Sequence, residues 1–337
     1  MRVLAGDIGG TKTILQLIDC AATGLPGTGA PLHDRRFDSQ AFPDFLPLVQ
    51  EFLSGAPPGE PVAAACLGIA GPLTVTSAGQ QSRLTNLPWV LDSQVLARAL
   101  DIPRVRLIND FQAVGHGIEL LSAGDLHTLQ SGYAQAQAPR ALVGAGTGLG
   151  VGMLLWQQDR YEVYATEGGH VSFAPTTEEQ VDLLRYMMRK YDRVSAERLV
   201  SGAGLVDIFE FLRERAAQPV MPQLKEALTE EDPAAVISRF ALSGEDPIAE
   251  HALDLFVALY GAQAGDVALM TLAHGGVFIA GGIAPKILAR MKGETFLHAF
   301  NNKGRMARLT ANMPVHVVLN PRVGLLGAAM VAARLID

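Results

Sequence analysis

The first residues with the means for chemistry stand in a glycine turn near the start of the chain. In the segment VLAGDIGGTKTILQLID an acid, Asp7, precedes Gly9, Gly10 and Thr11 between two apolar, strand-like runs. Because glycine has no Cβ, the backbone N–H groups of such a turn approach an anion closely, and the Thr11 hydroxyl adds a donor. The turn therefore predicts a phosphate-binding loop, although threonine is also common in strands for packing reasons.

A second turn of the same kind lies near the middle of the chain. LVGAGTGLGVGMLL repeats the strand, glycine-threonine turn and strand of LAGDIGGTKTILQL, with Gly146, Thr147 and Gly148 at its tip. Short glycine-rich strings often resemble one another by chance, but a third glycine turn, AGGI, with Gly281 and Gly282, favours a repeated motif. Two such loops in two domains would hold a polyphosphate from both sides.

Two other phosphate-binding loops also use glycine-rich strings. In GDIGGTKT, Thr11 separates the last glycine from Lys12, and a strand follows where a P-loop requires a helix. In GAGTGLG, Leu149 stands where the dinucleotide fingerprint has its third glycine, and again a strand follows. The pattern excludes a P-loop and disfavours an NAD site. Strand alternation leaves the direction of the Lys12 side chain undecided.

Polar residues at the ends of other predicted elements are candidates for substrate contacts. Asp110 ends the apolar strand VRLIND and begins a helix, so its carboxylate can cap that helix. The same carboxylate can project from the strand end into a cleft and accept a proton, and the two roles are compatible. Asn109, beside it, is compatible with a turn-forming asparagine. Glu197 follows Ser195 at the start of an expected helix, where an acid is favourable without any ligand.

The segment TEGGHVSF places a carboxylate and an imidazole around two glycines. The glycines allow a tight turn that points Glu167 and His170 the same way, although an exposed turn with incidental polar residues has the same pattern. A carboxylate accepts from two hydroxyls and a neutral histidine both donates and accepts, which suits the vicinal hydroxyls of a sugar. A metal site would need further ligands at fixed spacing.

Length and composition bound the function. A chain of 337 residues exceeds the usual size of one core, so two domains are expected. The net charge of −7 argues against a nucleic-acid partner. Cys20 and Cys66 are the only cysteines, which excludes a disulfide framework and a Cys-based zinc cluster. No signal peptide is evident at the N-terminus. The apolar residues 252–273 contain Asp254, Gln263 and Asp266, which predicts a buried helix rather than a membrane span, and a cytoplasmic protein.

Strands and helices alternate along the chain, which predicts an α/β protein. A low-pattern stretch over 122–140 suggests a connection between two units. The segment GGVFIAGGIAPKIL predicts a strand, a double-glycine turn and a helix with Pro285 in its first turn. The apolar patterns predict strands over 2–6, 13–19, 62–71, 105–110, 141–146 and 150–156, and helices over 42–53, 93–100, 111–121, 178–191 and 323–335.

Taken together and in order, GDIGGTKT, LINDF, GAGTGLG, TEGGH and AGGIAP resemble the bacterial ATP-dependent glucokinases of the actin and hexokinase superfamily over nearly the whole chain. The phosphate turns alone match only the superfamily; LINDF, TEGGH and Ser195-Ala-Glu-Arg198 make the match specific. Neighbouring sugar kinases that include repressors carry a Cys-rich zinc motif after the histidine. This chain lacks that motif, so no zinc is expected, and a first strand at residue 2 predicts no helix-turn-helix.

The resemblance implies two actin-like, ribonuclease-H-like α/β domains with an interdomain cleft, a small one of residues 1–120 plus 322–337 and a large one of residues 121–321. It implies transfer of the γ-phosphoryl group of MgATP to the 6-hydroxyl of glucose, which forms glucose 6-phosphate and ADP. A kinase of another hexose, such as fructose, mannose or an N-acetylated sugar, and a non-catalytic sugar sensor on the same fold are the alternatives. A homodimer is also implied.

The resemblance further implies a role for each candidate residue. Asp110 would be the general base toward the sugar hydroxyl, and Asp7 would contact Mg²⁺ through water. The sugar would be bound by Asn109, Asp110, Glu167, His170 and Glu197. ATP would be bound by Gly6, Asp7, Ile8, Gly9, Gly10, Thr11, Gly146, Thr147, Gly148, Gly281 and Gly282.

Overall fold

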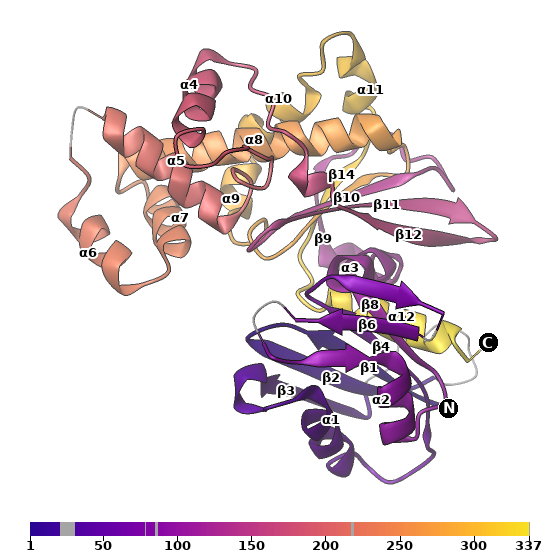
Figure 1. Ribbon diagram of the computed structural model, residues 1–337. Coiled ribbons are helices and arrows are strands. Elements are labelled where there is room, and N and C mark those ends of the chain that lie inside the picture. Colours follow the sequence, from indigo (N-terminus) through magenta and orange to yellow (C-terminus); the bar gives the residue numbers. More distant parts are fainter. Residues whose placement is uncertain (21–30, 78, 85–86, 217–218, 337) are drawn as a thin grey trace. The chain divides into compact units, whose positions relative to one another are not determined.

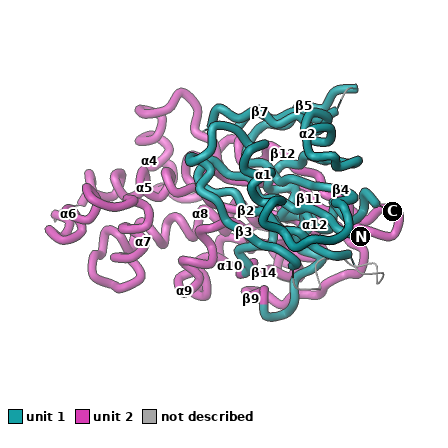
Figure 2. Tube along the Cα trace, turned by 90° about the horizontal axis from the view of Figure 1, so that it is seen from below, with its two compact units in different colours: residues 1–124, 320–337 teal, residues 125–319 magenta. Residues whose placement is uncertain are grey.

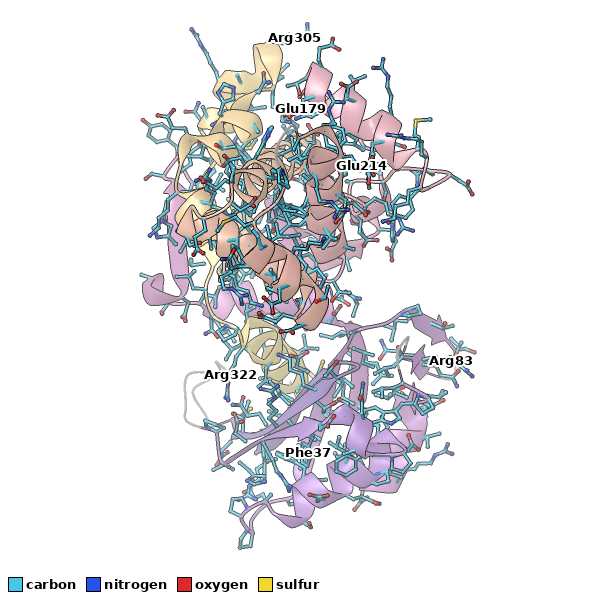
Figure 3. All side chains as sticks on the ribbon, turned by 90° about the vertical axis from the view of Figure 1, so that its left-hand side faces the viewer. Phe37, Arg83, Glu179, Glu214, Arg305 and Arg322 are labelled. Carbon is cyan, nitrogen blue, oxygen red and sulfur yellow. The ribbon has the colours of Figure 1, made fainter. Side chains whose placement is uncertain are left out.

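The chain forms one unit, leaves it after Gly124 and returns to it at Asn320. In this computed structural model, unit 1 consists of Met1–Gly124 and Asn320–Asp337, and unit 2 of Asp125–Leu319 (Figure 2). The structure describes residues 1–20, 31–77, 79–84, 87–216 and 219–336. Arg322, which is labelled in Figure 3, lies at the start of the returning segment and forms an ion pair with Asp34 of unit 1. The C-terminal helix is therefore tied to the N-terminal sheet by an ion pair as well as by packing.

Unit 1 is built on a five-stranded sheet of order β3-β2-β1-β4-β8. Strand β1 pairs antiparallel with β2 and parallel with β4, and β4 pairs parallel with β8. A small antiparallel sheet, β5-β6-β7, accompanies it. The strands are β1 Arg2–Ile8, β2 Lys12–Asp19, β3 His33–Asp38, β4 Val62–Ile69, β5 Leu73–Thr76, β6 Gly79–Arg83, β7 Val90–Asp92 and β8 Val105–Asn109.

Helices cover both faces of this sheet because side chains alternate along its strands. One face, with Leu4 and Leu15, packs on α1 (Phe45–Ser54) and α2 (Ser93–Leu100); the other, with Val3 and Ala5, packs on α3 (Asp110–Gly117) and α12 (Val323–Arg334). Figure 1 shows these two layers of helix around the sheet. Helices α3 and α12 cross in close contact, since a Cβ added at Gly327 would lie 1.8 Å from the Ala113 carbonyl oxygen.

Unit 2 is built on a six-stranded sheet of order β12-β11-β10-β13-β14-β9. Its central strand β10 pairs antiparallel with β11 and parallel with β13, which is the arrangement of β1 with β2 and β4 in unit 1. The shared strand order accounts for the similarity of the two glycine-threonine segments. The strands are β9 Leu126–Gln130, β10 Arg140–Ala145, β11 Leu149–Gln157, β12 Arg160–Thr166, β13 Val277–Ala280 and β14 Val315–Val318.

The helices of unit 2 pack around the long α8, Pro247–Thr271, whose N-cap Asp246 accepts from the N–H groups of Ile248 and Ala249. This helix is long and apolar enough to cross a membrane, but 67% of its most apolar window is buried inside the unit, as expected for a core helix. The other helices are α4 Glu178–Met187, α5 Gly202–Arg215, α6 Pro222–Glu230, α7 Pro233–Ser243, α9 Leu288–Met291, α10 Glu294–Asn301 and α11 Ala307–Ala311.

The predicted helix with Pro285 in its first turn is wrong. Residues after β13 form a turn closed by N–H donation from Lys286 and Ile287 to the Ile283 carbonyl, and α9 begins only at Leu288. The N–H of Ile283 instead donates to Ala145 at the end of β10. The turn is therefore hydrogen-bonded to the end of β10, and the helix begins only after it.

Candidate active site

The glycine turn of unit 1 joins β1 to β2 and directs its N–H groups outward. The Gly9 N–H donates to the Lys12 carbonyl, 3.0 Å away, and this bond closes the turn. Within the described part of the chain, the N–H groups of Gly10 and Thr11 have no hydrogen-bond acceptor. Two adjacent donors without a protein partner at the end of a hairpin are suited to an anion.

Asp7, Gly6 and Ile8 all lie in β1, immediately before this turn. Ile8 is fully buried, so it supports the turn from the core rather than presenting its side chain to a ligand. Burial raises the pKa of the Asp7 carboxyl, and the nearby Lys12 charge opposes that rise. Lys12 therefore compensates the buried carboxylate only in part, which suits a contact with a metal ion or its water.

Asn109 and Asp110 lie at the carboxyl edge of the same sheet, where β8 ends and α3 begins. The N-cap of α3 is Asn109, whose Oδ1 accepts from the N–H groups of Phe111 and Gln112. The interpretation of Asp110 as the N-cap is therefore wrong: Asp110 is the first helical residue, and its Oδ1 accepts from the Phe111 N–H, 2.8 Å away. The Asp110 carboxylate also accepts from the Asn109 side chain and from its own backbone N–H. The two carboxylate oxygens have further lone pairs and the Asn109 amide has a second hydrogen, so both side chains can still contact a ligand.

The environment of Asp110 suits a proton acceptor. Burial raises the pKa of its carboxyl, the hydrogen bond from the Phe111 N–H lowers it, and the negative charge of Asp7 raises it again. Strands β1 and β8 flank β4, so the two acids are separated by about two strand spacings, roughly 10 Å. A carboxylate whose pKa is raised toward the working pH is a stronger base than an exposed aspartate.

The glycine turn of unit 2 joins β10 to β11 and repeats the pattern of unit 1. The Gly146 N–H donates to the Gly148 carbonyl at 2.8 Å, and the Gly202 N–H, at the start of α5, donates to the Gly146 carbonyl at 2.9 Å. The N–H groups of Thr147 and Gly148 have no hydrogen-bond acceptor among the described residues. Each unit therefore presents two N–H donors from a β-turn-β loop.

Gly281 and Gly282 lie beside this second turn, because β13 pairs with β10 and ends next to it. Gly281 adopts a φ of +83°, and an added Cβ would lie 2.4 Å from the Ala145 carbonyl oxygen, so only glycine fits. The buried Tyr260 of α8 holds the two strand ends: its hydroxyl accepts from the Ala145 N–H at 3.0 Å and lies 3.3 Å from the Ala280 carbonyl.

Glu167, His170 and Glu197 gather on one side of unit 2. His170 lies between the two acids, with Nε2 3.7 Å from a Glu167 oxygen and Nδ1 3.7 Å from a Glu197 oxygen. The Glu167 side chain is 91% exposed and that of Glu197 only 30%, so Glu197 has the more constrained position. The Glu197 N–H also donates to the Gly169 carbonyl, which joins the two segments through the backbone.

Glu197 connects this cluster to the glycine turn of unit 2. Its Oε2 accepts from the Leu149 N–H at 3.0 Å, immediately after the turn, while its Oε1 faces His170. The expected helix start at Glu197 is wrong, since residues 197–199 form a turn and α5 begins at Gly202 with Ser201 as N-cap. A backbone N–H of β11, rather than a helix terminus, stabilises this carboxylate.

Two residues that support the turns were not predicted from the sequence. Ser39 lies outside every motif, and its buried hydroxyl donates to the Gly9 carbonyl at 2.8 Å. Tyr260 lies in the apolar run of α8, where its hydroxyl is the one feature that could have indicated a polar contact in the core. Both act on backbone groups, which no side-chain pattern identifies.

Two sheets that share the order of five strands, each with a β-turn-β loop that presents N–H donors, define the class of actin-like sugar kinases with two-domain architecture. A ROK-family glucokinase from Streptomyces griseus, solved in complex with glucose and AMPPNP, has this fold, with a TM-score of 0.62 and 21% identity over 99% of this chain and 100% of that one.

The chain belongs to the glucokinase family, whose model matches residues 4–335. It is 47% identical to a glucokinase of Trichormus variabilis over 99% of both chains. The crystal structure of a glucokinase from an Antarctic psychrotroph matches with a TM-score of 0.83 and 29% identity, again over 99% of both chains. Membership of this family confirms the resemblance drawn from the motifs.

Proposed function

We propose that the protein transfers the γ-phosphoryl group of MgATP to the 6-hydroxyl of glucose and releases glucose 6-phosphate and ADP. The observation that carries the proposal is Asp110, a carboxylate at a strand end whose pKa is raised by burial, in a chain of the glucokinase family. Phosphoryl transfer demands little covalent chemistry from the protein, but it needs an aligned hydroxyl and an acceptor for its proton.

In this proposal each unit supplies part of the machinery for one reaction. Asp110 accepts the proton of the sugar 6-hydroxyl, and Asn109 donates to the sugar through its amide because its oxygen is engaged by α3. Glu167, His170 and Glu197 bind the remaining hydroxyls. A sugar with an inverted or missing hydroxyl leaves one of these groups unsatisfied, which is the basis of selectivity.

The nucleotide is assigned to the backbone donors. The N–H groups of Gly10 and Thr11 in unit 1, and of Thr147 and Gly148 in unit 2, are proposed to bind phosphate oxygens, with the two threonine hydroxyls beside them. Gly281 and Gly282 are proposed to approach the adenosine portion. Such donors hold charge without reorganising, so they stabilise the negative charge that spreads over the phosphoryl oxygens in the transition state.

A divalent cation accompanies the ATP-dependent reaction of this family. The described residues contain no group of three or more His, Cys, Asp or Glu side chains that could hold a metal ion. Asp7, a single carboxylate beside donors for phosphate, fits Mg²⁺ that is bound mainly by ATP oxygens and water and contacted by the protein through a water molecule. The ion would neutralise phosphate charge.

A sugar panel tests the reaction and the substrate together. Glucose, fructose, mannose and N-acetylglucosamine are compared in ADP-coupled assays with MgATP, and glucose should have by far the highest kcat/KM. Comparable values for another hexose would contradict glucose specificity. Asp110→Ala should abolish phosphorylation while glucose still binds; activity within a few-fold of the parent would reject Asp110 as the base and revive the sugar-sensor alternative.

The other expectations are proposals with simple tests. We propose a cytoplasmic homodimer whose small domain is residues 1–120 plus 322–337 and whose large domain is residues 121–321. Light scattering after gel filtration measures the oligomeric state, and a monomeric mass at micromolar concentration would contradict the dimer. Limited proteolysis tests the domain boundaries, with cleavage expected near residues 121 and 321.

A further inference from the structure

We infer that Ser39 is a positioning residue for the glycine turn of unit 1, an inference that rests on the proposed binding of ATP phosphate by that turn. Ser39 begins a short 3-10 helix, Ser39–Ala41, just after β3, whose Phe37 is buried in the core and visible in Figure 3. Ser39 and Thr13 are both fully buried, so their hydroxyls need partners inside the protein.

The direction of the hydrogen bonds around Ser39 follows from its neighbours. The Ser39 Oγ lies 2.8 Å from the Gly9 carbonyl oxygen and 2.9 Å from the Thr13 Oγ1. A carbonyl can only accept, so the single Ser39 hydroxyl hydrogen goes to Gly9, and Ser39 accepts from Thr13. The Ser39 backbone N–H also donates to the Thr11 carbonyl at 3.0 Å. One residue thus engages two carbonyls of the turn.

This contact sets the orientation of an N–H group that is assigned to phosphate. In a trans peptide the C=O of one residue and the N–H of the next point in opposite directions. Because the Gly9 carbonyl points to buried Ser39, the Gly10 N–H of the same peptide points away from it, out of the core. Glycine on both sides of this bond leaves the peptide free to rotate unless such a contact holds it.

The chain offers a matched control for this role. Ser39→Ala removes the bond to Gly9, whereas Thr13→Val removes only the donor behind Ser39 and keeps both the side-chain shape and the Ser39–Gly9 bond. Both variants interrupt the same buried chain of hydroxyls, so a purely structural role would make them alike. If Ser39 positions the turn, only Ser39→Ala changes nucleotide affinity.

The experiment measures three quantities for the full-length protein and both variants. These are the dissociation constant of MgAMPPNP by calorimetry, the KM values for ATP and glucose, and the melting temperature. We expect Ser39→Ala to weaken MgAMPPNP binding and raise the KM for ATP roughly five- to tenfold, with the glucose KM unchanged, because one oriented hydrogen bond is lost. Thr13→Val should stay within about twofold of the parent on both nucleotide measures.

The inference is overturned if Ser39→Ala binds MgAMPPNP as the parent does, or if Thr13→Val weakens binding equally. If Ser39→Ala does not fold, Ser39→Cys, with a weak S–H donor of similar size, replaces it and should give a smaller loss; parental affinity would reject the role. A parent that binds MgAMPPNP but does not phosphorylate glucose contradicts the proposed function alone, and the affinity ratio still decides on Ser39. A parent without nucleotide affinity contradicts both.

Discussion

Gly148 provides the sharpest test of how the glycine turn of unit 2, proposed to bind phosphate, is connected to Glu197, proposed to bind the sugar. A Cβ added there would lie 2.6 Å from the Glu197 Oε2, whereas ordinary contact begins at 3.4 Å. In Gly148→Ala the carboxylate must therefore retreat by about 0.8 Å. Such a shift would stretch its 3.0 Å bond to the Leu149 N–H beyond hydrogen-bonding range and displace the oxygens beside His170.

The expected magnitude follows from the value of one hydrogen bond to a charged group. Losing the proposed hydrogen bond between a sugar hydroxyl and Glu197 would cost about 1.5–3 kcal/mol, which corresponds to a roughly 10- to 150-fold higher dissociation constant for glucose. Calorimetry with glucose alone measures this without nucleotide. Gly146→Ala is the control, since its added Cβ would meet no atom within 4 Å, and it should keep glucose affinity within about twofold.

A double-mutant cycle isolates the contact. In a Glu197→Ala background the methyl group of Gly148→Ala has no carboxylate to displace, so the second substitution should add almost nothing to the loss of glucose affinity. The reasoning is refuted if Gly148→Ala binds glucose like the parent, if Gly146→Ala loses as much, or if the two substitutions are additive. Melting curves exclude loss of fold as the cause.

Four further predictions concern the acids of unit 1 and its helix crossing. The acidic limb of the pH profile of kcat/KM for glucose should lie above the ordinary aspartate pKa, since burial and the charge of Asp7 raise the pKa of Asp110. Asp7→Asn should move that limb to lower pH, but not to the ordinary aspartate pKa, because the burial of Asp110 remains. An unmoved limb would contradict this reasoning. Asp110→Asn should raise the melting temperature at pH 7 while activity is lost, because a carboxyl whose pKa is raised by folding destabilises the fold when it is ionised. The gain in melting temperature should vanish below the ordinary aspartate pKa, where the carboxyl is protonated in both the folded and the unfolded protein. Equal gains at both pH values would contradict the raised pKa. Asp7→Ala should reduce kcat and raise the Mg²⁺ concentration needed for half-maximal rate, with glucose affinity nearly unchanged, as Mg²⁺ titrations can check. Gly327→Ala should lower the free energy of unfolding, measured by urea titration, by about 2–4 kcal/mol, because its methyl group would overlap the Ala113 carbonyl. The control Gly324→Ala, whose added Cβ would have no atom nearer than 3.6 Å, should lower it by less than about 1 kcal/mol.

The local patterns of the chain already determined its class and its candidate residues. Apolar runs and glycine turns act over a few residues, so the strand-turn-strand segments around Gly10 and Thr147 could be recognised without a structure, and their motifs in order indicated the family. The acids and the glutamine in the apolar run around Tyr260 predicted a buried helix, and most of the apolar window of α8 is buried inside unit 2.

Tertiary structure decided which groups hold these residues in place. Asn109 rather than Asp110 caps α3 because only the folded end of β8 determines which side chain reaches the free N–H groups. The Leu149 N–H donates to Glu197, 48 positions away, and Ser39 donates to the Gly9 carbonyl, 30 positions away. Apart from proline, which lacks the N–H, every residue has the same backbone donor and acceptor. Their pairing at such separations therefore leaves no mark in the sequence and depends on the packing of the whole unit.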